Sequence, residues 1–293
     1  MYLNSMGEES TWLDASDMKR ITGSDYYLSG LLTPKTVTIQ AAAYVRGFAQ
    51  GLSRNVNIYE NSPVIAMKRA DGIWKVNTPK GSVFAPKVLL CVNGHLQSFG
   101  FLKQRLMHIF LYASMTRAMT TEEIHRLGGE SSWGVAPANP FGSSVRKSCG
   151  VGGHRILMRN KFQFNSTMEA SDSDIQRTVR NHDRSFQRRF PMLKNLEMEY
   201  RWGGRLCLSW NGVPVFGEIE DGLFAACCQN GVGVSKGTLS GILAAEYASG
   251  FQNSYIEDYL NEKQPTRLPP EPIATMGATA YLNWQEWRAG LEK

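Results

Sequence analysis

Long apolar runs and paired cysteines are both missing from this sequence. No stretch of about 18 consecutive apolar residues occurs in the chain, so no membrane-spanning helix is expected. The N-terminus has neither a basic start nor an apolar core, which argues against a signal peptide. The five cysteines are odd in number and lack Cys-x-x-Cys spacing. This pattern favours reduced, mostly buried thiols in a cytoplasmic protein over disulfides or structural zinc.

A concentrated basic surface is also missing. The net charge of +6 comes from 32 basic and 26 acidic residues that are dispersed along the 293-residue chain. The main basic cluster, Arg177 to Arg189, lies on a predicted helix over 172–190 and is interpreted as a solvent-exposed face. Nucleic-acid binding would rest on net charge alone and is not expected. Hydrophobic content of 42% with 28 glycines predicts a globular α/β or α+β protein of one large or two medium domains.

The most informative segment runs from residue 223 to residue 250. Its first six residues form an apolar run, which predicts a strand buried on both faces. A glycine turn follows over 229–233, and a helix is expected from Val234 to a stop at Gly250. Free N–H groups at the start of that helix would favour a phosphate or an electron-rich carbonyl oxygen. The alternative is an ordinary strand-turn-helix whose glycines only form the turn. The apolar face predicted for the helix consists of Leu239, Ile242, Leu243 and Tyr247.

Signals elsewhere divide the chain into an interrupted domain and a middle domain. Helices are predicted over 11–21 and 40–52, a hairpin turn at Asp71-Gly72, and an inner parallel strand over 87–92 that ends at Asn93-Gly94. Residues 101–205 contain β-rich segments and one long helix, which predict an antiparallel sheet backed by a helix. We therefore expect a discontinuous α/β domain over 1–100 and 206–293 and an α+β domain over 101–205.

Several segments, in this order, resemble the FAD-dependent amino-acid and amine oxidase family that includes D-amino-acid oxidase, glycine oxidase and sarcosine oxidase. The resemblance is carried by Ser-Pro-Val at 62–64, the strand and turn at 88–94, Tyr-Arg-Trp-Gly-Gly at 200–204, Asn-Gly-Val-Pro-Val-Phe-Gly at 211–217 and Gln-Asn-Gly-Val-Gly-Val at 229–234. Residues 273–281 look closest to the γ-glutamylputrescine oxidase branch. The resemblance implies a Rossmann-like FAD-binding domain and an antiparallel-sheet substrate domain.

One family feature is missing from the sequence. Members open with a strand, a Gly-x-Gly-x-x-Gly turn and a helix that hold the FAD pyrophosphate. No such fingerprint occurs here, so the chain resembles a member whose FAD-binding domain is incomplete and lacks its first βαβ unit. Three explanations of the missing segment remain open: a truncated piece, a shortened gene product, or one subunit of a split enzyme in which a second chain supplies that segment.

The resemblance implies FAD as the cofactor and assigns positions to it. The backbone at 64 would pair with the adenine edge, residues 93–94 would border the diphosphate and flavin, and the glycines at 203–204 would lie near the flavin ring. The turn at 229–234 would place N–H groups against the flavin pyrimidine oxygen. The implied cofactor-binding residues are Val64, Asn93, Gly94, Gly203, Gly204, Gln229, Asn230, Gly231, Val232, Gly233 and Val234.

Substrate residues follow from the same resemblance. The residues proposed to line the cavity are Tyr112, His154, Arg155, Trp202 and Arg205, with plain core packing as the alternative for the aromatics. An arginine there would suit a substrate carboxylate through paired hydrogen bonds.

The implied reaction oxidises the C–N bond of an amine or amino acid. A hydride passes to flavin, oxygen reoxidises the flavin, and no catalytic side chain or metal is assigned. The five histidines are interpreted as surface or hydrogen-bonded residues. The alternative function is a non-catalytic truncated homologue or accessory subunit that acts through protein–protein contact at an open sheet edge.

Overall fold

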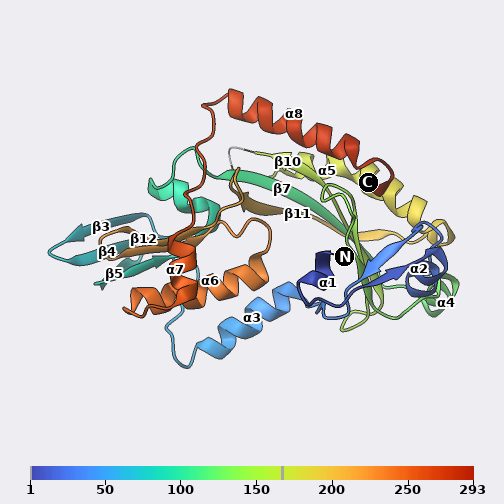
Figure 1. Cartoon of the computed structure of the whole chain (residues 1–293), viewed down its shortest axis with the longest axis horizontal. Helices are drawn as coiled ribbons and strands as arrows, with labels where there is room; N and C mark the ends of the chain where they lie inside the picture. The colour runs from blue at the N-terminus through green and yellow to red at the C-terminus, as the bar shows by residue number, and fades with distance from the viewer. Residues whose placement is uncertain (1, 166–167) are drawn as a thin grey trace. The chain divides into compact units, whose positions relative to one another are not determined.

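The structure is a computed structural model that describes residues 2–165 and 168–293, and it divides into two compact units (Figure 1). Unit 1 comprises Met1–Thr38, Ile109–Arg205 and Pro272–Lys293, and unit 2 comprises Ile39–His108 and Leu206–Glu271. The expected domain bounds are therefore wrong at both ends, because residues 1–38 and 272–293 pack with the middle of the chain. Among the described residues, none of the helices combines the length and apolarity needed to cross a membrane.

Unit 1 is built on a five-stranded sheet with the order β11-β7-β10-β9-β8. The strands are β7 (Met107–Thr116), β8 (Trp133–Val135), β9 (Ser144–Ser148), β10 (Arg155–Phe164) and β11 (Met198–Leu208). The pairings of β10 with β7, β10 with β9 and β8 with β9 are antiparallel, as predicted for this part of the chain. The register of β10 shifts between Asn160 and Phe162, and the extra residue, Lys161, has a φ of 62°.

One long helix, α5 (Asp172–Arg189), packs against β10 and closes the core of unit 1. Ser171 caps it in a capping box with Asp174, which fixes where the helix begins. Val145, Met158 and Phe186 are buried in the same apolar cluster, so the sheet and α5 share one core. The short helix α4 (Thr121–Leu127) begins with the predicted Thr120 cap and has its own capping box.

The two ends of the chain complete unit 1. The remaining elements are α1 (Tyr2–Ser5), β1 (Thr11–Leu13), α2 (Ala15–Thr22), β2 (Gly30–Leu32), α8 (Ile273–Arg288) and the 3₁₀ turns η2 (Pro191–Leu193) and η3 (Gly290–Glu292). The helix predicted over 11–21 is wrong in its first turn. Residues 11–13 pair with β2, and the Asp14 side chain accepts from the Asp17 N–H, so α2 begins only at Ala15.

The basic cluster on α5 also differs from the prediction. Arg189 is only 2% exposed, so the cluster is not a uniformly solvated face. Its guanidinium donates to the carbonyl oxygens of Ser185 and Glu292 and lies 4.5 Å from the ring centroid of Tyr26. This arginine therefore ties both chain ends to α5, a role that a helical charge pattern does not reveal.

Replacing Gly23 with alanine is expected to destabilise unit 1. Gly23 ends α2 with a φ of 75°, and a Cβ at this position would lie 2.1 Å from the Leu127 carbonyl oxygen. The left-handed backbone alone costs about 1–2 kcal/mol for a residue with a side chain, so a loss of about 2 kcal/mol or more in the free energy of unfolding is expected. Chemical denaturation measures it. The control is Gly277→Ala in α8, where no atom lies within 4 Å and a gain of about 0.5–1 kcal/mol is expected; equal effects of both substitutions would contradict the prediction.

Unit 2 combines a three-stranded meander with a three-stranded mixed sheet. The meander is β3 (Ala66–Ala70), β4 (Ile73–Thr78) and β5 (Gly81–Ala85), and the predicted hairpin turn at Asp71-Gly72 is confirmed. The mixed sheet has the order β12-β13-β6, from β6 (Val88–Leu90), β12 (Val215–Glu220) and β13 (Leu223–Cys227). β13 is buried at every position and pairs parallel with β6. The helical elements are α3 (Ala41–Leu52), η1 (Asn93–Phe99), α6 (Gly233–Ala248) and α7 (Ser254–Leu260).

Apolar surface is left uncovered on several elements of unit 2. None of the described side chains of α3 is buried, and Val45 and Phe48 are 62% and 58% exposed. On α6 only Leu243 of the predicted apolar face is buried, whereas Leu239 and Ile242 are about half exposed. Within the described chain β6 is an edge strand, not the inner strand that its apolar sequence predicts.

Candidate functional site

The carboxyl ends of the two parallel strands meet at one edge of the unit 2 sheet. The backbone N–H of Cys228, just after β13, donates to Asn93 Oδ1, just after β6, at 3.2 Å. Asn230 Oδ1 accepts from the Ser209 N–H at 2.9 Å, and Asn230 Nδ2 donates to the Cys228 carbonyl at 3.0 Å. The two asparagines therefore act as braces for the turn between β13 and α6. Parallel strands place ligands at this edge in open α/β sheets.

The start of α6 leaves backbone donors available. The helix begins at Gly233, and its N-cap residue, Val232, makes no side-chain capping bond. A Cβ at Gly233 would meet no atom within 4 Å, so the backbone is open to approach. Gln229 Nε2 donates to Ser240 Oγ at 2.8 Å, while Gln229 Oε1 is a buried acceptor without a partner among the described residues. Uncapped N–H groups, open space and the helix dipole fit an acceptor such as a flavin carbonyl oxygen.

Gly94 has a packing role that the structure defines. A Cβ at this position would lie 2.5 Å from His108 Cε1 and 3.5 Å from Cys207 Cβ. Only glycine fits between these side chains, and His108 is held in turn by Gln97, whose Nε2 lies 3.0 Å from His108 Nε2. A contact of Gly94 with a cofactor stays a prediction.

Val64 lies beside a cavity of unit 2. The cavity has a volume of about 780 Å³, and its lining includes Val64, Trp74, Val92, His95 and Phe101. Val92 immediately precedes Asn93, so the cavity begins next to the strand ends described above. A hollow with apolar and aromatic walls fits a flat heteroaromatic ring such as adenine.

The two predicted glycines of β11 lie on opposite faces of the unit 1 sheet. Arg201 forms an ion pair with Asp183 of α5 at 2.6 Å, and a Cβ at Gly203 would lie 3.2 Å from the Tyr112 ring. Arg201 and Gly203 therefore face α5, and strand alternation puts Trp202 and Gly204 on the other face. Trp202 is 37% exposed there.

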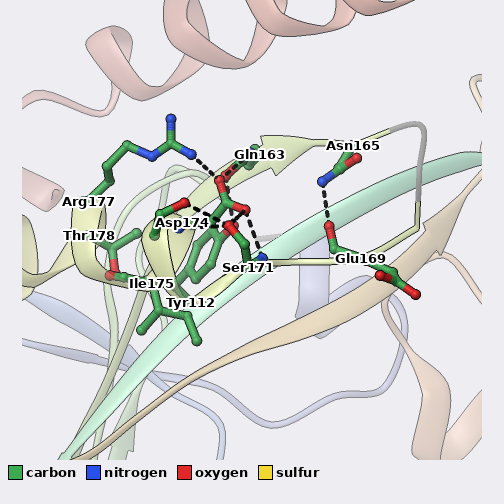
Figure 2. A network of polar contacts seen from close by, with 10 residues as sticks. Tyr112, Gln163, Asn165, Glu169, Ser171, Asp174, Ile175, Arg177 and Thr178 are labelled. Carbon is green, nitrogen blue, oxygen red and sulfur yellow. Dashed lines mark hydrogen bonds and ion pairs between the residues drawn. The ribbon is translucent and has the colours of Figure 1, made fainter.

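Tyr112 belongs to a polar network at the start of α5 (Figure 2). Its hydroxyl donates to Gln163 Oε1 at 2.7 Å, and Gln163 Nε2 donates to Asp174 Oδ1 at 3.1 Å. Arg177 forms an ion pair with the same carboxylate. Burial, with the nearby negative charge of Asp174, raises the pKa of Tyr112 to about 12, so the phenol stays neutral. Tyr112 therefore connects β7 through Gln163 to the start of α5. Its substrate role stays a prediction.

The other predicted substrate residues are dispersed over unit 1. Arg155 pairs with Glu199 at 2.5 Å and lies 5.4 Å from the Tyr200 ring centroid, so its charge is already compensated. His154 Nε2 lies 3.3 Å from Cys149 Sγ in the loop before β10. Arg205 is exposed within β11. The substrate roles of these residues stay predictions.

Two arginines outside the predicted set stand on the sheet face away from α5. Arg159 of β10 is directly opposite Ser144 of β9, and Arg146 is opposite Leu157 in the same register. Neither strand alternates apolar with basic residues, since β9 reads Ser-Val-Arg-Lys-Ser and β10 begins Arg-Ile-Leu-Met-Arg, so no periodic signal distinguished these two arginines. Among the described residues, no group of three or more His, Cys, Asp or Glu side chains is arranged to hold a metal ion.

Comparisons with known proteins agree with this geometry. The chain is 27% identical over 241 residues to the probable oxidoreductase OrdL of Haemophilus influenzae, covering 81% of this chain and 53% of the relative. It is 25% identical over 242 residues to the gamma-glutamylputrescine oxidoreductase of Escherichia coli, covering 81% and 54%. The crystal structure of glycine oxidase from Geobacillus kaustophilus superposes with a TM-score of 0.73 at 17% identity, covering 92% of this chain and 70% of that one.

The chain spans about half the length of these curated relatives. Residues 2–247 match the DAO family, described as FAD dependent oxidoreductase. The fold is accordingly a mixed α/β one of the DAO type with an antiparallel sheet. This confirms the resemblance predicted from the sequence: because the family match extends over more than half of the chain, the protein belongs to the DAO family of FAD-dependent oxidoreductases.

Proposed function

We propose that this chain forms the greater part of an FAD-dependent oxidase of amines or amino acids. The observation that carries the proposal is the meeting of Asn93 with the turn before α6 at the carboxyl ends of two parallel strands. The resemblance to the oxidase family implies a cofactor contact for both segments. The uncapped start of α6 adds donors at the same edge.

Bound FAD would accept a hydride from the carbon beside the substrate amine and pass electrons to oxygen. The residues of this chain supply binding and orientation. Asn93 and Asn230 would keep the turn rigid, and the N–H groups at Gly233 and Val234 would stabilise negative charge on the flavin pyrimidine edge. Val64 and the cavity beside it would receive the adenine.

The pyrophosphate-binding fingerprint is not among the 293 residues, so part of the cofactor site would come from elsewhere. Two features favour an added βαβ segment that carries Gly-x-Gly-x-x-Gly. The outer edge of β6 is unpaired within the described chain. None of the described side chains of α3 is buried, so its apolar residues are exposed. A strand added at β6 would extend the parallel sheet, whether it came from a second chain or from the same longer protein.

Flavin binding tests the proposal. The chain is expressed alone, and also together with the portion of an OrdL relative that this chain does not match. Quenching of FAD fluorescence on titration is expected in the pair, and Gly233→Leu is expected to weaken binding about tenfold or more, or about 1.4 kcal/mol, because the side chain fills the approach to α6.

The matched control is Gly241→Leu, which lies further along α6 and also has no atom within 4 Å of its Cβ position. It should leave the FAD affinity unchanged. Absence of flavin binding both alone and in the pair, with both proteins folded, would rule the proposal out. That result would favour the second candidate, a non-catalytic accessory subunit, which the exposed apolar faces of α3 and α6 also support.

A further inference from the structure

A thiol and an imidazole meet at the base of the turn that joins β9 to β10. The pairing of these two strands ends with Ser148 opposite Arg155. The next residue on each side, Cys149 and His154, are therefore cross-strand neighbours. His154 Nε2 lies 3.3 Å from Cys149 Sγ, within hydrogen-bond distance for sulfur. The thiol thus has a proton acceptor in contact with it.

The turn is held by its own hydrogen bonds and leaves the thiol open to solvent. The Gly153 N–H donates to the Gly150 carbonyl oxygen at 2.9 Å, and Arg155 Nε donates to the Gly152 carbonyl oxygen at 3.0 Å. Cys149 and all four residues of the turn are exposed. A small molecule can therefore reach the sulfur without any rearrangement of the backbone.

A buried cation lies near the same thiol. Lys147 is two residues before Cys149 on β9 and is only 2% exposed. Its Nζ donates to the Gly128 carbonyl oxygen at 3.0 Å, and it forms no ion pair with any residue that the structure describes. Burial lowers the pKa of Lys147, and the negative charge of a Cys149 thiolate acts in the opposite direction. Because this attraction acts on both partners, the uncompensated ammonium group favours the thiolate form of Cys149.

The imidazole makes no second polar contact that would orient it as in a hydrolase. His154 Nδ1 is buried and has no hydrogen-bond partner among the described residues. Enzymes that use a cysteine nucleophile for repeated turnover usually orient the base through a third group. The pair of Cys149 and His154 therefore fits a thiol that is modified once better than one that turns over a substrate.

We propose that Cys149 is a modification site for hydrogen peroxide, with His154 as its proton acceptor. The Cys149 sulfur gives its proton to His154 Nε2 and attacks one oxygen of the peroxide. An S–O bond forms as the O–O bond breaks, and the leaving hydroxide takes the proton from the imidazole to become water. The sulfur loses two electrons, the peroxide gains them, and Cys149 becomes a sulfenic acid.

The proposed function would supply this oxidant, and only the source of the peroxide rests on it. Reoxidation of a two-electron-reduced flavin by oxygen produces hydrogen peroxide. Sulfenic acid at Cys149 would then accumulate with turnover of the enzyme. The reactivity of the thiol itself needs no flavin, because it depends on the residues around the turn.

The other cysteines of the chain provide an internal comparison, and all of them belong to unit 2. Cys91 is also exposed, but burial of its sulfur raises its pKa, which disfavours the reactive thiolate. The remaining cysteines are buried: Cys207, Cys227 and Cys228. We therefore expect peroxide to select Cys149.

Competition between the two exposed thiols tests the site. The purified chain is treated with hydrogen peroxide and dimedone, which labels sulfenic acids, and tryptic peptides are quantified by mass spectrometry. Trypsin cleaves after Lys147 and Arg155, so Cys149 and Cys91 lie in different peptides. An ordinary thiol is only about one-tenth ionised at about pH 7.5, so Cys149 is expected to be labelled about tenfold faster than Cys91 at that pH.

Two variants connect the rate to the imidazole. His154→Gln keeps a polar side chain but accepts no proton, and it is expected to slow labelling of Cys149 about tenfold while Cys91 keeps its rate. The matched control is His125→Gln, at an exposed position of α4, which should leave both rates unchanged.

Equal labelling of Cys149 and Cys91 in the unmodified sequence would overturn the site, and this comparison does not depend on the folding of any variant. An unchanged Cys149 rate in folded His154→Gln would overturn it as well. Because the peroxide is added directly, a failed FAD titration would defeat the proposed function and leave the labelling result interpretable. The two failures are therefore distinguishable.

Discussion

Replacing Glu286 with alanine is expected to lower the free energy of unfolding of unit 1 by about 3–5 kcal/mol, the usual loss when one partner of a buried ion pair is removed. The Glu286 side chain is 3% exposed and forms an ion pair with Lys161 at the bulge of β10. Its Oε1 accepts from the Phe162 N–H at 2.9 Å, the donor that the bulge removes from the strand ladder. Its Oε2 lies 3.2 Å from Lys293 Nζ. Removal would leave an ammonium group and a backbone donor without their acceptor.

Chemical denaturation measures this loss, and two further variants make it specific. Glu286→Gln retains an acceptor for the Phe162 N–H but loses the charge, so an intermediate loss is expected. Glu122→Ala, at an exposed position of α4, is the control and should change the free energy by about 0.5 kcal/mol or less. A loss below about 1 kcal/mol in Glu286→Ala would show that α8 is not anchored through this carboxylate.

Acidification is expected to destabilise unit 1 through His182. The side chain is 1% exposed on α5, and burial, with the nearby positive charge of Arg201, lowers its pKa from 6.5 to about 4. Arg201 donates to Ser114 Oγ at 3.1 Å, and Ser114 Oγ lies 2.5 Å from His182 Nδ1. Ser114 Oγ accepts from Arg201, and its own proton is available for donation to Nδ1 of the neutral imidazole.

The direction of the effect follows from proton binding. Between pH 6.5 and about 4 the unfolded chain binds a proton at this histidine and the folded chain does not, so stability falls as the pH falls through this window. A difference of this size corresponds to about 3 kcal/mol at 1.36 kcal/mol per pKa unit. Asp174 and Glu123, whose pKa values are lowered to about 2, contribute in a separate window below their unfolded values.

Denaturation at a series of pH values checks the role of His182. In His182→Gln the slope of stability against pH should flatten between pH 6.5 and 4, although the stability at neutral pH also drops because the Ser114 hydrogen bond changes. His125→Gln, at an exposed position of α4, is the control and should keep the full slope. Identical slopes in the two variants would exclude a neutral buried His182.

Features determined by neighbours in the sequence were predictable. The hairpin at Asp71-Gly72, the Thr120 cap of α4 and the strand-turn-helix after residue 223 each depend on a few adjacent residues. The meeting of Asn93 with the Cys228–Val234 turn was also accessible, because parallel strands carry their carboxyl ends to the same edge.

Features determined by distant partners were not predictable. The burial of Arg189 depends on carbonyl groups contributed by the last residues of the chain, and the bulge at Lys161 is stabilised by a carboxylate on α8. The apolar side chains of α3 have the period of a core-facing helix but none is buried, and on α6 Leu239 and Ile242 stay about half exposed although Leu243 is buried. The arginine pair of Arg159 and Arg146 became visible only when the register put the two strands side by side.

The parallel pairing of β6 with β13 has a consequence during protein synthesis. The hydrogen bond from Cys228 to Asn93 joins residues 135 positions apart. At about 5–20 residues per second, the ribosome would need on the order of ten seconds to deliver β13 after β6 has emerged. During that interval the nascent strand would present an apolar, hydrogen-bonding edge to solvent, which makes it a target for chaperones that bind extended segments.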